Sequence, residues 1–399
     1  MGRTLGWALF LAVSWTWCIG MYLPNLLVRD GGLPFFFAFF VPNVIGAASV
    51  GFVLRTRARS SAFVAVMRLP MLWFSAITIA FQVYFLSWKM IDDLRFGVLH
   101  LPAGIAMGAI VASVAALLRG RVDWVPALAT LLCTIAAGVL LVSQPPEVVA
   151  SEPVSALIGL SMVTAIGFGL CPYLDLSFNR AVQHASSPPA AFGVGFFVIF
   201  AVIILVVTRG RAVWTPRDAP FEMGIDWALG AMGLHFGAQA AFTVLAHSAA
   251  LAALRPDGAI AGMTESADET VRRRPRLRVW MLLPAIIGLA IGGGVPFLPR
   301  VDLPGFVSPI GPGEFVYRLF LGFYGLVFPV WMLVSLGRRV STDRATLAWL
   351  LGVCVVSGPF LWVGSIGRDE VWLIPGVSLI LLAGAYRFMT RTPVVSAQA

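Results

Sequence analysis

Few residues in this chain could bind a solute or a proton, and Asp175 is the sharpest candidate. It stands in "GFGLCPYLDLSFNRA", three residues after Pro172 and within a long apolar stretch. An acid at the centre of a membrane span costs about 2.5–3.5 kcal/mol on insertion scales, so it usually faces a cavity or a partner. Asp175 could therefore bind a cation, a substrate amine or a proton. Alternatively, the span ends early and Asp175 lies at the membrane interface, paired with Arg180.

Two further sets of polar residues recur at intervals of three or four, which places each set on one face of a helix. The members are Ser75, Thr78 and Gln82 in one apolar segment and His235, Gln239 and Thr243 in another. The two stripes could face a shared pathway, with His235 as a proton carrier because imidazole titrates near neutral pH. Alternatively, both stripes hydrogen-bond to neighbouring helices, as polar residues of membrane bundles commonly do.

The other histidines and the cysteines suggest less chemistry. His100, His184 and His247 lie near the ends of apolar segments, so we expect them at the membrane interface. The cysteines lie inside apolar segments without the spacing of metal ligands or disulfides, and we expect them to pack as small apolar residues. They are Cys18, Cys133, Cys171 and Cys354. The sequence predicts no metal site and no catalytic residue.

The elements that carry these residues are membrane spans. The chain is 59% hydrophobic and 12% charged, whereas soluble domains contain about 25% charged residues. A helix needs about 20 mostly apolar residues to cross a bilayer. The segments that meet this length are Leu5–Leu27, Pro34–Leu54, Pro70–Trp88, Val98–Leu118, Trp124–Ser143, Pro153–Tyr173, Pro189–Val207, Ile225–Leu254, Val279–Leu298, Glu314–Leu336, Thr346–Ile366 and Val371–Met389. We therefore expect an all-α integral membrane protein with about 12 transmembrane helices.

The net charge of +9 does not indicate nucleic acid as a partner. Most arginines fall in short loops that share one side of the membrane, as the positive-inside rule requires. This bias places both termini in the cytoplasm, and the clusters at Arg55–Arg59 and Arg272–Arg278 suit contacts with anionic lipid. Lys89 is the only lysine among the 28 Lys and Arg residues. That skew favours a GC-rich bacterial genome and hence an inner membrane.

Two apolar segments share an unusual interruption. "CIGMYLPNLLVRD" contains Gly20 and Pro24, and "GFGLCPYLDLSFNRA" contains Gly169 and Pro172. Proline kinks or breaks a helix, and broken helices persist in a membrane only when they are buried in protein or line a watery cavity. The two copies are five spans apart, so they cross the membrane in opposite directions. The sequence thus predicts an inverted repeat with discontinuous helices 1 and 6. Its units are residues 1–152 and 153–337, and residues 338–399 carry two additional spans and a tail.

This pattern resembles the leucine-transporter fold of the sodium:solute symporters and the amino acid/polyamine/organocation carriers. The resemblance covers the first ten spans, and "GGLPFFFAFFVPNVIGAASVGFVL" is similar to the second span of such carriers. It implies that substrate is bound by residues at the two breaks and on spans 3 and 8. The residues that it implies are Trp17, Gly20, Met21, Gln82, Gly169, Pro172, Asp175, His235 and Gln239. A cation site would use Cys18 and Thr243, although sodium-coupled members commonly have a Ser/Thr pair where this chain has Thr243 and the more distant Ser248.

We therefore expect a secondary active transporter that moves a small polar solute by alternating access, driven by a sodium or proton gradient. No phosphate-binding Gly-Lys-Ser/Thr loop indicates ATP as the energy source, and no cofactor is expected. A major-facilitator carrier would place its long loop between spans 6 and 7, whereas this loop follows span 8. A membrane-embedded enzyme, or a sensor or assembly protein with a carrier-like fold, stays open. The solute, the coupling ion, the direction of transport and the oligomeric state cannot be read from the sequence.

Overall fold

The computed structural model describes residues 2–93, 104–105, 108, 124–142, 153–211, 226–260, 275–301, 310–336 and 341–390. These residues are mostly helical, with no strand among them and two isolated bridges, Leu254 to Ile260 and Val301 to Ile310. In the described part of the chain, nine helices are long and apolar enough to cross a membrane, and two shorter apolar helices accompany them. The predicted multi-pass character is confirmed. The predicted span Val98–Leu118 lies almost wholly outside the described residues.

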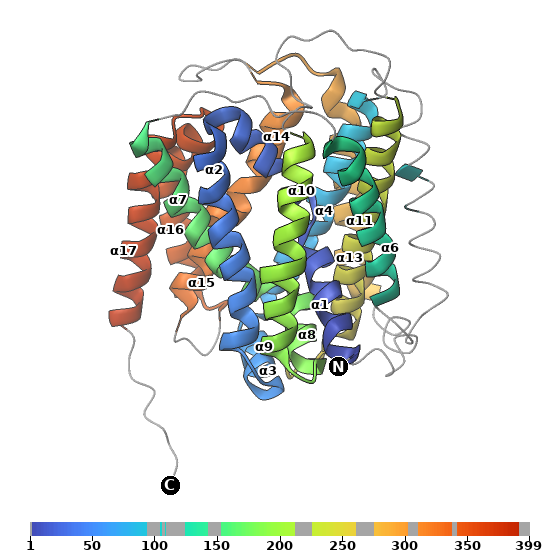
Figure 1. Ribbon diagram of the computed structural model, residues 1–399. Helices are drawn as coiled ribbons and strands as arrows, with labels where there is room; N and C mark the ends of the chain where they lie inside the picture. Colours follow the sequence, from blue (N-terminus) through green and yellow to red (C-terminus); the bar gives the residue numbers. More distant parts are fainter. Residues whose placement is uncertain are drawn as a thin grey trace.

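The helices pack side by side in one bundle, and α3, α8 and α9 lie at the end that carries the N-terminus (Figure 1). In chain order the α-helices are α1 (Gly2–Trp15), α2 (Cys18–Val53), α3 (Arg57–Val66), α4 (Arg68–Asp93), α6 (Trp124–Val142), α7 (Val154–Leu170), α8 (Leu176–His184), α9 (Pro188–Gly193), α10 (Ala201–Arg211), α11 (Asp226–Ala253), α13 (Pro275–Gly294), α14 (Pro312–Gly322), α15 (Phe328–Ser335), α16 (Arg344–Leu361) and α17 (Leu373–Met389). Shorter 3₁₀ and π segments join them: η1 (Cys171–Leu174), η2 (Val194–Phe200), η4 (Val295–Phe297), η5 (Phe323–Val327), η6 (Trp362–Ile366) and η7 (Glu370–Trp372).

Helix α2 contains a sharp turn and belongs to two crossings of the bundle. Its backbone leaves the helical region at Gly31 and Gly32, and Gly32 has a φ of 70°. Glycine adopts this left-handed conformation without the steric cost of a Cβ. The chain therefore rises through Cys18–Asp30, turns at the two glycines and returns towards the N-terminal end (Figure 1). The turn falls where the sequence separates the first two apolar segments.

The first interrupted span consists of α1 and the part of α2 that precedes Gly31. Its helix breaks at Thr16–Trp17, where Trp17 is extended with ψ −167°, and not at Gly20–Pro24. The predicted position was wrong because the helix tolerates Pro24. Proline there removes one hydrogen bond, the one to the carbonyl of Gly20 one turn back, and the helix continues through it. Gly20 instead serves packing, because a Cβ there would lie 3.1 Å from Ile204.

The second interrupted span consists of α7, η1 and α8, and its break is at the predicted place. The helix tightens at Cys171–Leu174, becomes extended at Asp175 (φ −75°, ψ 114°) and restarts at Leu176. Pro172 begins the 3₁₀ turn because its missing N–H needs no partner at that position. α1 leads away from the N-terminal end of the bundle, whereas α7 leads towards it (Figure 1). The two interrupted spans therefore run in opposite directions.

Aromatic side chains pack the two breaks against each other. The ring of Trp15, from the first break, lies 5.0 Å from that of Phe178, from the helix after the second break. Trp17 meets Tyr324 edge to face at 5.0 Å, and Cys171 Sγ lies 3.4 Å from the carbonyl oxygen of Tyr324. Both breaks are thus buried in the core beside η5.

Candidate functional site

The break in the first interrupted span is held by side chains from other helices. Gln239 of α11 donates from Nε2 to the carbonyl of Val13 at 2.7 Å. Gln82 of α4 accepts the backbone N–H of Cys18 at 2.8 Å, and Tyr317 of α14 donates to the carbonyl of Cys18 at 3.0 Å. Buried backbone groups require such partners. Two residues that the sequence selects for the site, Gln82 and Gln239, therefore contact this break directly.

The break in the second interrupted span is satisfied by its own residues. Asp175 Oδ1 accepts the backbone N–H of Ser177 at 2.7 Å, which caps the start of α8. Asn179 Nδ2 donates to the carbonyls of Tyr173 and Asp175, each at 2.9 Å. Asp175 is 0% exposed. Asp175 is therefore buried inside the bundle, and its depth in the membrane stays a prediction.

The second carboxylate oxygen of Asp175 faces a histidine that the sequence places elsewhere. Asp175 Oδ2 lies 3.9 Å from His247 Nε2, and His247 Nδ1 lies 3.2 Å from Ser75 Oγ. All three residues are buried. α11 continues to Ala253 and buries His247 against the second break, whereas its expected place at the membrane interface stays a prediction. A signal was present, since His247 extends the four-residue spacing of His235, Gln239 and Thr243.

The polar stripe on α4 reaches three different elements. Ser75 contacts His247 of α11, Thr78 shares a 3.0 Å hydrogen bond with Tyr324 of η5, and Gln82 holds α2. On α11, His235 Nδ1 lies 3.0 Å from Thr134 of α6. Both stripes thus make interhelical hydrogen bonds and also converge on the breaks, so the two interpretations of the stripes do not exclude each other. His235 contacts α6, and His247 is the histidine beside Asp175.

The remaining predicted substrate residues occupy different positions around the breaks. Trp17 is buried edge-on against Phe81 and Tyr324. Met21 and Pro172 are buried in their respective helices. Gly169 is half-buried, and a Cβ at its Cα would meet no atom within 4 Å.

The two predicted cation ligands have separate protein partners. The carbonyl oxygen of Cys18 accepts from Tyr317, and Thr243 Oγ1 accepts from Gln239 Nε2 at 3.3 Å. Among the residues that the structure describes, no group of three or more His, Cys, Asp or Glu side chains could hold a metal ion.

Several buried polar atoms near the breaks make no hydrogen bond within the described residues. They are Asp175 Oδ2, Gln82 Nε2, Gln239 Oε1 and Ser177 Oγ. Buried polar atoms nearly always have partners, so each exception needs an explanation. Asp175 Oδ2 and Gln239 Oε1 can accept a hydrogen bond, Gln82 Nε2 can donate one, and Ser177 Oγ can do either. A small polar ligand needs both kinds of partner.

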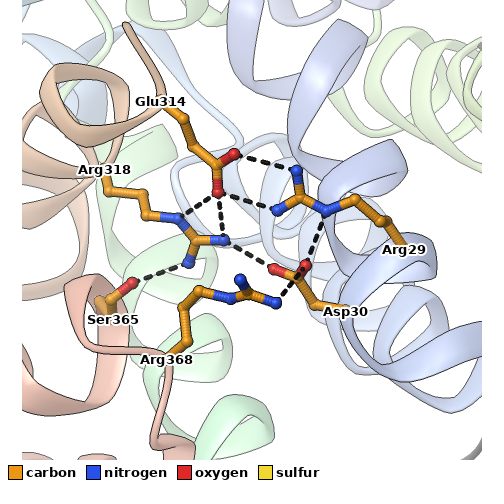
Figure 2. Close-up of polar contacts among 6 residues, drawn as sticks. All are labelled: Arg29, Asp30, Glu314, Arg318, Ser365 and Arg368. Atoms are coloured by element: carbon orange, nitrogen blue, oxygen red, sulfur yellow. Dashed lines mark hydrogen bonds and ion pairs between the residues drawn. The ribbon is translucent and has the colours of Figure 1, made fainter. Parts of the chain in front are cut away.

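An ion-pair cluster that the sequence does not predict joins the end of the first interrupted span to distant helices (Figure 2). Its members are Arg29, Asp30, Glu314, Arg318 and Arg368. Arg29 pairs with both oxygens of Glu314, at 2.8 and 2.9 Å. Asp30 accepts from all three arginines at 2.6–3.1 Å. The four-residue spacing of Glu314 and Arg318 in an apolar segment was a signal, but their partners lie about 285 residues away in the chain.

A cavity of about 510 Å³ extends from this cluster towards the breaks. Its lining is mostly apolar and comes from α2, α7, α14, η5, α16, η6, η7 and α17. Arg318 of the ion-pair cluster and Tyr324, which contacts both breaks, are among its lining residues. The cavity therefore lies between the cluster and the core around the breaks. Comparison of the chain with protein-family models and with curated proteins finds no match.

Proposed function

We propose that the protein is a secondary active transporter that moves a small polar solute by alternating access. The observation that carries the proposal is the pair of buried, adjoining breaks in two antiparallel spans. Interrupted helices at membrane depth are tolerated where they are buried in protein or line a cavity. Pairs of them in oppositely oriented segments mark the binding sites of transporters.

The proposed architecture is a five-plus-five inverted repeat of leucine-transporter type. Residues 1–152 and 153–337 form the two halves, and two further helices follow. This proposal is supported by the positions of the two breaks, one at the start of each half, and by their opposite directions. It places both termini in the cytoplasm of a bacterial inner membrane.

In each interrupted span, polar contacts hold the segment that follows the break. These contacts lie at opposite ends of the bundle. The ion-pair cluster ties Cys18–Asp30 to α14 and to Arg368, between η6 and η7. At the other end, Gln183 of α8 accepts the N–H of Ile260 at 2.8 Å and donates to Ser60 of α3 at 3.1 Å. Alternating access needs two such closures that open in turn. We propose that these contacts are the two closures.

Solute binding is proposed where the free polar atoms and the aromatic rings meet. Asp175 Oδ2, Gln82 Nε2 and Gln239 Oε1 supply acceptors and a donor, and Trp17 and Tyr324 supply ring surfaces. A compact solute with both donor and acceptor groups fits this chemistry. The lipid bilayer is the medium, and no nucleic acid or cofactor takes part.

The test is transport by the purified full chain in proteoliposomes. Radiolabelled amino acids, sugars, nucleobases and small osmolytes are offered under imposed sodium or proton gradients. At least one class is expected to accumulate above its level in protein-free vesicles, and Asp175→Asn is expected to abolish accumulation. Asp257→Asn is the matched control, because Asp257 caps Ala259 N–H in an exposed turn as Asp175 caps Ser177. Absence of accumulation for every solute and gradient would refute the proposal.

A further inference from the structure

We infer that Asp175 and His247 together form a proton-binding site, and that this site makes transport proton-coupled. The binding of the proton stands on the geometry alone, whereas the coupling rests on the proposed function. The two residues come from different elements: Asp175 from the break in the second interrupted span and His247 from α11.

The geometry leaves one position between the two side chains for a proton. Asp175 Oδ1 is used by the Ser177 N–H at 2.7 Å. Oδ2 accepts no hydrogen bond within the described residues and faces His247 Nε2 at 3.9 Å. Both side chains are at most 2% exposed. A carboxylate in this setting gains most from an added positive charge directly opposite Oδ2.

A proton suits this position better than a sodium ion. Hard cations are bound by several oxygen ligands at once. Here the group opposite Asp175 Oδ2 is an imidazole nitrogen, which is not one of the oxygen ligands that a hard cation prefers. The oxygens expected for sodium, Cys18 O and Thr243 Oγ1, accept hydrogen bonds from Tyr317 and Gln239. Imidazole binds a proton readily near neutral pH.

The proton step conserves charge and needs no other reactant. A proton from water bonds to the lone pair of a ring nitrogen of neutral His247 and gives an imidazolium. Both ring nitrogens then donate, Nε2 to Asp175 Oδ2 and Nδ1 to Ser75 Oγ. A serine hydroxyl can either donate or accept, so Ser75 serves both charge states. Loss of the proton to water on the other side of the membrane returns the neutral ring.

Protonation of His247 also moves α11 relative to α8. A charge-assisted N–H···O bond spans about 2.7–2.9 Å, whereas the present separation is 3.9 Å. Charging His247 therefore draws α11 and the start of α8 together by about 1 Å. α11 also carries Gln239, which holds the break in the first interrupted span. One proton can in this way act on both breaks.

Few other ionisable groups surround the pair. Tyr324 of η5 and Cys171 of η1 lie beside Asp175, and Arg180 is buried further along α8. α4 contributes Ser75 and the ring of Phe74, which do not titrate. Free tyrosine and cysteine lose their protons at pH values of about 10 and 8.5. Neither competes for a proton near neutral pH, so the pair is the group that binds it.

Histidine protonation in the purified full chain, reconstituted in lipid, tests the binding of the proton. The probe is the proton itself, read from ¹⁵N signals of labelled histidine between about pH 5 and 8, the range in which imidazole ordinarily titrates. The chain has 4 histidines, and His247→Gln assigns the signal of interest. His247 is expected to become an imidazolium in this range. Asp175→Asn is expected to lower its proton affinity at least about tenfold, because an opposite charge has been removed.

The matched control is His235→Gln, which removes another buried histidine, in contact with Thr134. It is expected to leave the His247 titration unchanged. Ser75→Ala keeps both titrating groups and provides a second variant in case Asp175→Asn fails to fold. It removes the partner of Nδ1 and is expected to lower the proton affinity of His247. The proton site would be overturned if His247 stayed neutral over the whole pH range. It would also be overturned if neither the Asp175 nor the Ser75 substitution changed the titration of His247.

Coupling is measured separately in proteoliposomes that contain a pH-sensitive dye. Addition of a transported solute is expected to acidify the lumen in the wild type and not in His247→Gln. If His247 titrates but no solute moves, the proton site stands and the transporter proposal fails. If a solute accumulates under a sodium gradient without proton entry, the transporter stands and the proton coupling is overturned.

Discussion

The ion-pair cluster gives a stability prediction that centres on Asp30. This carboxylate is the member that contacts all three arginines, at 2.8 Å to Arg29, 2.6 Å to Arg318 and 3.1 Å to Arg368. Asp30→Asn keeps the shape of the side chain and one acceptor oxygen but removes the charge. Glu314 then has to balance the arginines, although it contacts Arg29 and Arg318 and not Arg368 in the interactions described.

The expected loss follows from the burial of the cluster. The Asp30 side chain is 5% exposed, and the three arginines are 9–19% exposed. Removing one partner from a buried ion pair costs about 3–5 kcal/mol because the remaining charge stays desolvated. Partial exposure of the arginines favours the lower end, about 3 kcal/mol. At an unfolding entropy of about 2.1 cal/mol/K per residue, this loss lowers the melting temperature by about 4 °C for this chain.

The four free cysteines provide the assay, because all of them are buried or half-buried in the folded protein. A thiol-reactive dye that fluoresces on coupling therefore reports unfolding in detergent. Arg368→Gln, alone and combined with Asp30→Asn, completes a double-mutant cycle. It is expected to cost about 1 kcal/mol in the wild type and less in the Asp30→Asn background, because its carboxylate partner is then absent. Strictly additive effects, or a melting temperature unchanged by Asp30→Asn, would show that the cluster is not a coupled buried network.

Three further predictions use the same unfolding assay. Gln82→Leu leaves the buried N–H of Cys18 without the acceptor that it has now, so it is expected to cost about 1–3 kcal/mol; a cost below 0.5 kcal/mol, about the error of such comparisons, would contradict that role. Gly46→Ala directs a methyl group at the backbone carbonyl of Phe168 and is expected to cost about 1–3 kcal/mol, whereas the control Gly352→Ala meets no atom within 4 Å. Arg55 has a φ of 47°, and Arg55→Gly is expected to stabilise the protein by about 0.5–1 kcal/mol, because relief of left-handed strain exceeds the added flexibility of the unfolded chain; a lower melting temperature would refute this.

Much of the fold was predictable because apolar length is a local property. The turn at Gly31–Gly32 and the break at Pro172–Asp175 both carry a strong backbone signal in a few residues. The break at Thr16–Trp17 does not. There, the interruption exists because Gln82 and Gln239 replace the missing backbone partners from other helices. A single stretch of sequence cannot show that support, whereas the glycine and proline a few residues later are conspicuous.

The candidate site was predictable to a similar extent. Helical spacing identified Gln82 and Gln239, because residues on one face of a helix share their surroundings. It did not select His247, which was expected at the membrane interface because it lies near the end of an apolar segment, although its spacing continues the stripe. The ion-pair cluster could not be predicted from the sequence for another reason. Its pairing of Arg29 with Glu314 depends on how the first span meets α14, and no local pattern encodes that meeting.

The two breaks differ in how they are held, and this difference assigns them different tasks. The second break is capped by its own residues, Asp175 and Asn179, and Ser60 of α3 adds a bond to Asn179 Oδ1 at 2.9 Å. The first break has carbonyl and N–H groups held by α11 and α4, so any shift of those helices alters it. The acidic residue, Asp175, lies at the second break. The backbone groups that depend on other helices lie at the first break. A proton bound at Asp175 and His247 would therefore shift α11 and, through Gln239, change the geometry of the first break.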